Sequence, residues 1–311
     1  MISLDPSIGF IQPVTPMLRT ALAASALAAS VLASLPASGQ LVVPGFDAAH
    51  ITGSHTGGID LGGGNGGMSA SRLHARSILS TGALSPRDGW FFLPFFQYTM
   101  TSLDFDGAPA PFRDEDLHSL SLSSMFLIMR EGSPWLIGGW SRAELASDFR
   151  HIDGDDITFD LAGGVAYRFN PEITFGLGAG IINLNGDEKI YPGFALDWIV
   201  NDHLRLGIYG PIMLAAWAPA DEWLFTLRGD PAGGVWNVTD PAGQSRSIDF
   251  SSYRLGLYAS RHLGGRFWLT AGGGAALVNE IDYTTSGGRG IRGLNGDTGY
   301  FGLLGLRLKA W

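Results

Sequence analysis

The chain has 311 residues, of which 45% are hydrophobic and 16% are charged, and its formal net charge is −9. This charge excludes the basic excess that is typical of nucleic-acid-binding domains, and a cysteine count of 0 excludes a disulfide framework, a thiolate metal site and a cysteine nucleophile. Glycine, with 45 residues, is enriched to about twice its average frequency of roughly 7%.

Residues 1–39 are predicted to be a secretory signal peptide. Arg19 precedes an uncharged run of Ala, Leu, Val and Ser over residues 21–35, and small residues follow as far as Gly39. A basic residue, an apolar run too short to span a bilayer and a small-residue cleavage site are typical of export signals. Residues 1–16 do not resemble the start of such a signal, which favours Met17 as an alternative start. We therefore expect an exported protein that is cleaved after Gly39.

Residues 40–88 are rich in glycine and serine and show little periodicity. This composition predicts a flexible leader, with a short strand as an alternative, rather than a domain. The first domain is expected to begin at Gly89.

Residues 89–311 show an alternation of period two between apolar and polar or small residues. It is clearest after residue 156, where Phe159 and Leu161 alternate with Thr158 and Asp160. Such alternation predicts β-strands with one apolar and one polar face. The predicted strands cover residues 90–104, 117–129, 135–145, 157–169, 173–183, 191–200, 204–214, 223–227, 235–238, 248–261, 267–281 and 300–311.

These strands have no second layer to cover their apolar faces, because the sequence shows no helical pattern. A sheet closed into a cylinder in a membrane solves this problem, since its apolar face meets lipid and its lumen accepts glycine and charge. The sequence therefore predicts an all-β fold, an antiparallel up-and-down transmembrane β-barrel of about 12 strands over residues 89–311. Its short and long connections alternate, as periplasmic turns and outer loops do. Aromatic residues near the predicted strand ends, such as Trp90 and Trp135, are typical of interfacial girdles.

Six short segments carry a resemblance to a known family. They are residues 134–139, 177–180, 191–198, 209–211, 233–236 and 254–257, which read PWLIGG, LGAG, YPGFALDW, YGP, GGVW and RLGL. These segments resemble those of an uncharacterised bacterial family that is known only as a domain of unknown function. The resemblance covers about residues 90–311 and implies an outer-membrane β-barrel, with no known activity to transfer.

The C-terminal segment resembles the last strand of outer-membrane barrels, through which the barrel-assembly machinery recognises its substrates. Leu304, Leu306 and Leu308 alternate towards a final aromatic, Trp311. The register departs from that pattern, because Trp311 falls on the face of Lys309. The expected partners are this machinery and outer-membrane lipid, with no nucleic acid.

Charged residues on the polar faces are predicted to line the lumen. Two hypotheses remain open: a charged constriction that selects solutes by sign and size, or internal ion pairs that fill a narrow cylinder and close it. The candidates are Arg142, Glu144, Asp160, Arg168, Asp197, Arg205, Arg228, Arg254, Arg307 and Lys309.

Catalysis is not expected. Glu144 and Asp160 could pair as in glycoside hydrolases, but two carboxylates among many bases are more often salt-bridge partners. The nucleophile motif Gly-x-Ser-x-Gly does not occur. We expect no catalytic residue, no metal and no cofactor.

The functional hypothesis is an outer-membrane β-barrel, either a porin-like passive channel or a structural barrel, with a charged lumen. The alternatives are a secreted, soluble β-sandwich that acts as a binding module and an outer-membrane hydrolase.

Overall fold

The computed structural model describes residues 47–79, 84–85, 89–184, 187–240, 243–285 and 290–309. These residues form a single sheet, and the only helix among them is the 3-10 turn η3 (Gly154–Asp156). None of the described helices is long and apolar enough to cross a membrane. The predicted signal peptide, residues 1–39, lies outside the described residues.

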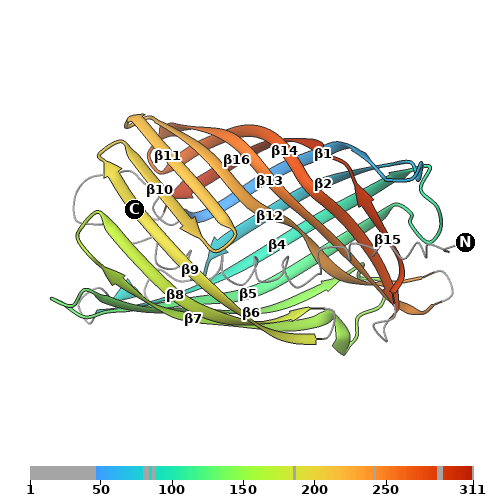
Figure 1. Ribbon diagram of the computed structural model, residues 1–311, viewed down its shortest axis with the longest axis horizontal. Coiled ribbons are helices and arrows are strands. Elements are labelled where there is room, and N and C mark those ends of the chain that lie inside the picture. The colour runs from blue at the N-terminus through green and yellow to red at the C-terminus, as the bar shows by residue number, and fades with distance from the viewer. Residues whose placement is uncertain are drawn as a thin grey trace, which may run out of the picture.

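Within the described residues, fourteen of the sixteen strands close into one antiparallel ring, a β-barrel (Figure 1). The ring strands are β1 (Asp47–Asp60), β2 (Gly67–Ile78), β4 (Trp90–Asp106), β5 (Glu115–Met129), β6 (Trp135–Ser147), β7 (Ile157–Arg168), β8 (Ile173–Leu184), β9 (Asp187–Asn201), β10 (Leu204–Tyr209), β11 (Ile212–Ala220), β12 (Trp223–Thr239), β13 (Ser245–Gly264), β14 (Phe267–Thr285) and β16 (Gly299–Lys309). Each pairs with its neighbours in this order, and β16 closes the ring on β1. Outside the ring, β3 (Leu84–Ser85) pairs with β4 and β15 (Gly290–Gly296) pairs with β14.

The predicted all-β barrel is confirmed, but it has fourteen strands instead of about 12. Residues 40–88 account for part of the difference, because the structure places β1 and β2 there instead of a flexible leader. The predicted strand 204–214 is two strands, since Gly210 and Pro211 form a turn between β10 and β11. Conversely, the two predicted strands on either side of residues 228–234 are one continuous strand, β12.

The apolar faces of the strands point away from the barrel axis. Phe159 and Leu177 are 67% and 58% exposed, while Asp160 and Ala162 on the opposite face of β7 are buried. This inverts the arrangement of a soluble sheet, and it is the arrangement that lipid-facing strands require. The turn at Gly210 and Pro211 reverses the chain, and Leu214 on β11 packs on the inner side.

The two ends of the barrel differ. At one end, named here the turn end, the connections include the tight turns at residues 130–134, 169–172, 202–203, 221–222 and 265–266. At the other, named the loop end, longer connections include residues 61–66, 107–114 and 148–156. The predicted alternation of short and long connections is therefore present in the structure.

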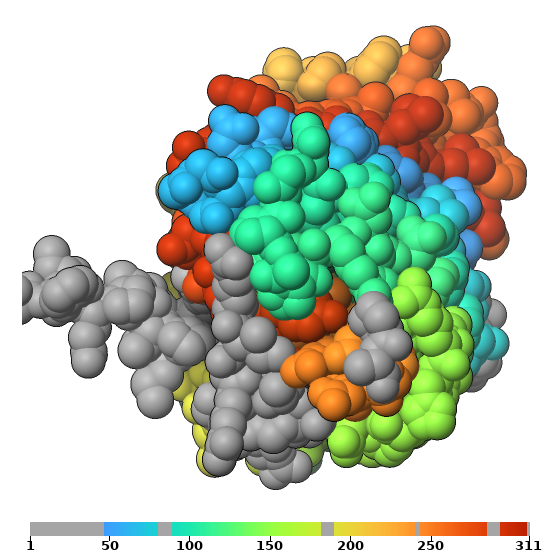
Figure 2. Space-filling view, turned by 90° about the vertical axis from the view of Figure 1, so that its right-hand side faces the viewer, coloured from blue at the N-terminus to red at the C-terminus, as the bar shows by residue number. Residues whose placement is uncertain are grey.

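The loop end is filled by apolar side chains, named here the loop-end core. Near this end β12, still paired with β13, bends inward and reaches β6, where Asn237 pairs in parallel with Ser147. Figure 2 looks onto this end, where orange β12–β13 atoms lie between the green β4–β5 and yellow-green β6–β7 segments. The core consists of Ile59, Leu61, Met68, Ala70, Leu103, Phe112, Leu117, Ala146, Trp236, Val238, Ile248, Phe250, Ile281, Tyr283 and Leu294.

The crossing of β12 depends on Gly233. Its φ of +123° lies in a region that L-residues rarely adopt, and a Cβ there would collide with the carbonyl oxygen of Phe250. Glycine therefore permits the bend that brings Trp236 inward, where its Nε1 donates to Ser119 Oγ at 2.9 Å.

We expect Gly233→Val to destabilise the barrel by about 1–3 kcal/mol, because the side chain forces strain on the β12 backbone. The urea midpoint of unfolding in detergent micelles measures this loss. Gly53→Ala is the control, since no atom lies near its Cβ position and its φ is ordinary. An unchanged midpoint for the valine variant would contradict the role given to this bend.

Candidate functional site

All ten predicted lumen residues lie on the same strand faces as buried inward side chains, judged from the alternation of burial along each strand. Nine of them make contacts within the barrel that are described below. Arg168 differs, because it lies at the turn end of β7 with an exposed side chain.

Arg142 on β6 connects two carboxylates. Its Nη1 lies 2.8 Å from Glu144 Oε2, and its Nε and Nη2 lie 2.8 and 2.5 Å from Asp160 Oδ2 on β7. The Asp160 side chain is only 1% exposed. A buried carboxylate without a partner is costly, so Arg142 stabilises Asp160 in this position.

A second network joins β9 and β10. Arg205 donates to both carboxylate oxygens of Asp197, at 2.5 and 2.7 Å, and Tyr209 donates to the same carboxylate at 3.1 Å. The bidentate geometry fixes both charged groups. Both networks therefore join adjacent strands instead of spanning the lumen.

Arg72 on β2 reaches across the lumen. Its Nη2 donates to the carbonyl oxygen of Gly233 on β12 at 3.0 Å, and it lies within electrostatic range of Glu144, Asp230 and Arg254. Residues from β2, β6, β12 and β13 thus form one region of mixed charge, named here the charged belt. The sequence analysis missed Arg72 because it treated β2 as leader, although Met68, Ala70 and Arg72 do alternate with serine.

Two predicted arginines complete the charged belt. Arg254 donates to Thr56 Oγ1 at 2.7 Å and stacks over the Phe301 ring at 5.0 Å. Arg228 lies 3.0 Å from Asp230 and is 45% exposed.

Basic side chains gather inside the turn end and form what we name the turn-end cluster. Arg307 pairs with Asp47 at 2.7 Å, and Lys309 Nζ lies 4.0 Å from the centre of the Trp268 ring. Among the described residues, Lys309 Nζ and Arg76 Nε are buried without a hydrogen-bond partner. The cluster consists of Asp47, His50, His74, Arg76, Arg307 and Lys309. It holds one acid, Asp47, against two arginines and one lysine.

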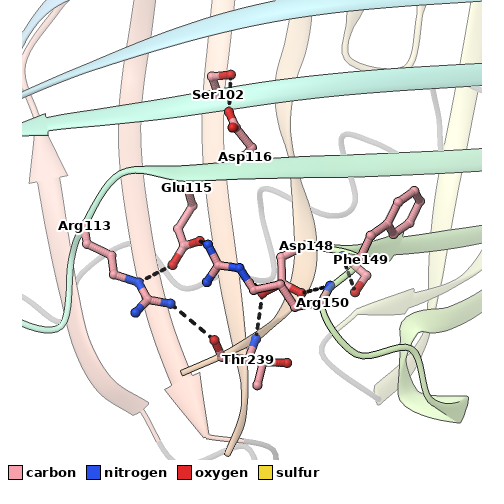
Figure 3. Close-up of polar contacts among 9 residues, drawn as sticks. Ser102, Arg113, Glu115, Asp116, Asp148, Phe149, Arg150 and Thr239 are labelled. Carbon is pink, nitrogen blue, oxygen red and sulfur yellow. Dashed lines mark hydrogen bonds and ion pairs between the residues drawn. The ribbon is translucent and has the colours of Figure 1, made fainter. Parts of the chain in front are cut away.

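The loop end carries an ionic network, named here the loop-end bracket and drawn in Figure 3. Glu115 at the start of β5 is buried and accepts from Arg113, and its other carboxylate oxygen lies 3.4 Å from Arg150. Arg113 also donates to the Thr239 carbonyl oxygen at 3.2 Å, and Asp148 Oδ2 accepts from the Thr239 backbone N–H at 3.0 Å. The loops beside β5 and β6 thus hold the end of β12.

Burial disfavours the charge of Arg113, but the ion pair with Glu115 outweighs this effect. The pKa of Arg113 is therefore raised above its ordinary value. Arg113 therefore stays charged across the physiological range.

The two carboxylates considered for catalysis, Glu144 and Asp160, both bind Arg142. This contact favours the salt-bridge interpretation over a hydrolytic pair. Among the described residues, no group of three or more His, Asp or Glu is placed to hold a metal ion.

A family profile described as "Domain of unknown function (DUF6268)" matches residues 95–291. No curated protein matches the chain.

Several solved structures are similar at low identity. An outer-membrane channel from Pseudomonas putida F1 has a TM-score of 0.42 and 9% identity, with 88% of this chain and 99% of that chain covered. The monoaromatic hydrocarbon channel TodX has a TM-score of 0.35 and 9% identity, with 85% of this chain and 89% of that chain covered. The translocator domain of the autotransporter NalP from Neisseria meningitidis has a TM-score of 0.32 and 11% identity, with 86% of this chain and 90% of that chain covered. Because these TM-scores are low, the closed barrel is assigned from the strand pairing of this chain.

We expect Arg142→Ala to cost about 3–5 kcal/mol of stability, because it leaves Asp160 buried without its cation. Unfolding by urea in micelles measures the loss. Arg228→Ala is the matched control: its ion pair is half-exposed, so its removal should cost about 1 kcal/mol or less. Equal losses for the two variants would show that burial does not separate the two ion pairs.

Proposed function

This chain belongs to the family described as a domain of unknown function (DUF6268), and from that premise we propose that it is a passive, anion-preferring channel of the outer membrane. The observation that carries the proposal is the division of its side chains, with hydrocarbon outside and an excess of cations inside. The absence of catalysis is part of the same proposal.

The outer face supports a position in a bilayer. On β13, Tyr253, Leu255, Leu257, Ala259 and Leu263 point outward, while Arg261 interrupts this face near the turn end and Ser251 and Asp249 follow towards the loop end. The outward stretch from residue 253 to residue 263 is close to the roughly 9–11 residues that a tilted membrane strand needs. Trp135 and Trp217, at the turn end, are about half-exposed, as expected for an interfacial girdle. A soluble β-sandwich would not leave such a continuous apolar surface in water.

The inner face supports selectivity for anions. The whole chain carries a net charge of −9, yet cations exceed acids on the inward faces of the described strands. The inward cations are Arg72, Arg76, Arg142, Arg168, Arg205, Arg228, Arg246, Arg254, Arg307 and Lys309, and the inward acids are Asp47, Glu115, Glu144, Asp160, Asp197 and Asp230. Rings of basic side chains favour the passage of anions.

The filled loop end favours a narrow channel rather than a wide, water-filled porin. The loop-end core and the loop-end bracket occupy the axis where a solute would enter. The bracket is the candidate gate, because its ion pairs hold β12 against β5 and β6. The structural-barrel alternative makes a different prediction, since it allows no conductance in any variant.

Export, membrane insertion and assembly follow from the proposal. Leu304 and Leu306 of β16 face outward, as expected for a strand recognised by the barrel-assembly machinery, while Trp311 lies outside the described residues. Heat-modifiable migration of the membrane fraction on a gel tests the location, and a soluble periplasmic product would contradict it. Hydrolase assays on Glu144→Ala and Asp160→Ala test the exclusion of catalysis.

We expect Glu115→Ala to raise the single-channel conductance in planar bilayers, because it removes the carboxylate that holds Arg113 against the Thr239 carbonyl oxygen at the end of β12. Asp116→Ala is the matched control. Its side chain is the next along β5 but points outward to Ser102, at 2.6 Å, so conductance should not change. If neither variant nor the parent shows any single-channel conductance, the structural barrel becomes the better interpretation.

We expect Lys309→Glu to lower the preference for anions, measured from the reversal potential across a KCl gradient. The reason is that Lys309 lies in the turn-end cluster and lacks a compensating acid of its own. Arg261→Glu serves as the control, because Arg261 is an exposed cation near the same end that lies over Trp223 at 5.5 Å. A reversal potential that responds equally to both substitutions would place the selectivity outside the lumen.

A further inference from the structure

The loop between β6 and β7, residues 148–156, holds the end of β12 through two of its residues. Asp148 Oδ2 accepts from the Thr239 backbone N–H at 3.0 Å, and the Asp148 side chain is only 1% exposed. Arg150 lies 3.4 Å from the buried carboxylate of Glu115. Residues 148 and 150 therefore both belong to the loop-end bracket.

Phe149, between these two residues, points away from the bracket. Figure 3 shows its ring on the side opposite to Glu115 and Thr239. The ring stacks on His118, with the ring centroids 4.9 Å apart and the planes inclined by 20°. His118 lies on the outer face of β5, because the residue before it, Leu117, belongs to the loop-end core. One loop residue thus lies on the outside of the barrel, while both of its neighbours hold β12.

The ring stack lies where the outward apolar residues end. On β5, Leu120 and Leu122 are exposed on the turn-end side of the stack, whereas Asp116 is exposed on its other side. Tyr98 of β4 extends the stack, since its hydroxyl forms a hydrogen bond with His118 Nδ1 at 2.9 Å. Aromatic rings favour this boundary between hydrocarbon and water. The stack therefore has the position of an interfacial girdle at the loop-end edge of the apolar surface.

The backbone at Phe149 connects the ring to the bracket. Its φ of +58° is unfavourable for a residue with a Cβ, and such a conformation persists only where the surroundings hold it. Ser147 Oγ accepts from the Phe149 N–H at 3.3 Å, and Asp148 Oδ1 accepts from the Arg150 N–H at 3.0 Å. Because these bonds enclose the turn on both sides, a displacement of the ring displaces the two bracket residues as well.

We propose that Phe149 anchors this loop at the surface of the bilayer and thereby couples the loop-end bracket to the lipid. The ring is 41% exposed and is continuous with the proposed lipid-facing surface, so the occupant is lipid at the headgroup boundary. While the ring lies in the lipid, Asp148 and Arg150 hold the end of β12, and withdrawal of the ring releases it. The coupling rests on the proposed membrane position and on the proposed gate.

Spin labelling tests the anchor. The chain contains no cysteine, so Phe149→Cys provides a single site for a nitroxide in the full chain folded into phosphatidylcholine vesicles. We expect its access to oxygen, relative to a water-soluble nickel chelate, to lie between two references. These are labels at Leu177→Cys on the lipid-facing wall and at Asp155→Cys on the exposed side of the same loop.

Two results would overturn the anchor. One is a label at position 149 that is as accessible to the chelate as the label at position 155. The other is spectral broadening by a second nearby label, because the surface would then bind another copy of the chain. Heat-modifiable migration of every variant verifies that the barrel has formed.

Hydrogen exchange of β12 tests the coupling. Phe149→Asn removes the ring but keeps a residue that tolerates a positive φ. We expect it to raise the exchange rate of residues 235–239 about fivefold in vesicles, as expected when a half-exposed aromatic contact is lost and the strand end opens more often. Phe149→Trp keeps an aromatic ring at the boundary and should restore slow exchange. Phe169→Asn, which removes an exposed ring at the turn end, is the control and should exchange as the parent does.

Bilayer thickness separates the lipid contact from simple packing on His118. The exchange rate of residues 235–239 in the parent should differ between short-chain and long-chain phosphatidylcholine vesicles, whereas Phe149→Asn should lose this dependence. Unchanged exchange in Phe149→Asn, or an equal response of both proteins to thickness, would overturn the coupling.

The outcomes also separate the coupling from the channel, because exchange is measured without a current. Faster exchange in Phe149→Asn in a barrel that never conducts would refute the channel and support the coupling. In a barrel that conducts, Phe149→Asn should spend more time open than the parent. Conductance that does not respond to this substitution would overturn the coupling and leave the channel.

Discussion

The closed ring of backbone hydrogen bonds is the constraint on which the rest of the structure depends. In hydrocarbon an unpaired N–H or C=O has no water to bind, so a membrane sheet must pair its first strand with its last. β1 and β16 satisfy this condition over ten pairs. Once the ring is closed, the period of two in each strand divides the side chains into an outer and an inner set. The division of hydrocarbon and charge follows from the closure.

Most of the face assignment could be predicted from the sequence, because alternation is a local property. Phe159 and Leu177 point outward as predicted, and Asp160 and Arg142 share the inner side. The strand count was less accessible. β1 and β2 present glycine, serine, threonine and histidine at many positions, so their period is weak. Their identity as strands depends on partners in β16 and β4 that lie far away in the sequence.

The partners of the charged residues could not be predicted for a related reason. An ion pair between strands depends on register, and register depends on turn lengths and on irregularities such as the Gly210–Pro211 turn. Arg142 and Asp160 meet because they are paired across β6 and β7, whereas Arg72 meets the backbone of β12 because Gly233 lets that strand bend inward. The positive φ at Gly233 cannot be predicted from one sequence, because the sequence shows only that the residue is a glycine. The same bend brings Trp236 and Val238 into the loop-end core.

The seam between β1 and β16 joins segments about as distant along the chain as this fold allows. Contacts of such separation form slowly, because the entropy of closing the intervening loop is lost before any pairing compensates it. The hairpins from β1 to β14 can pair before β16 is present. The sheet stays open, with two unpaired edges, until this final strand pairs with β1. The edge of β1 is therefore the last in the ring to find its partner, and until then it is the edge most open to pairing with another chain.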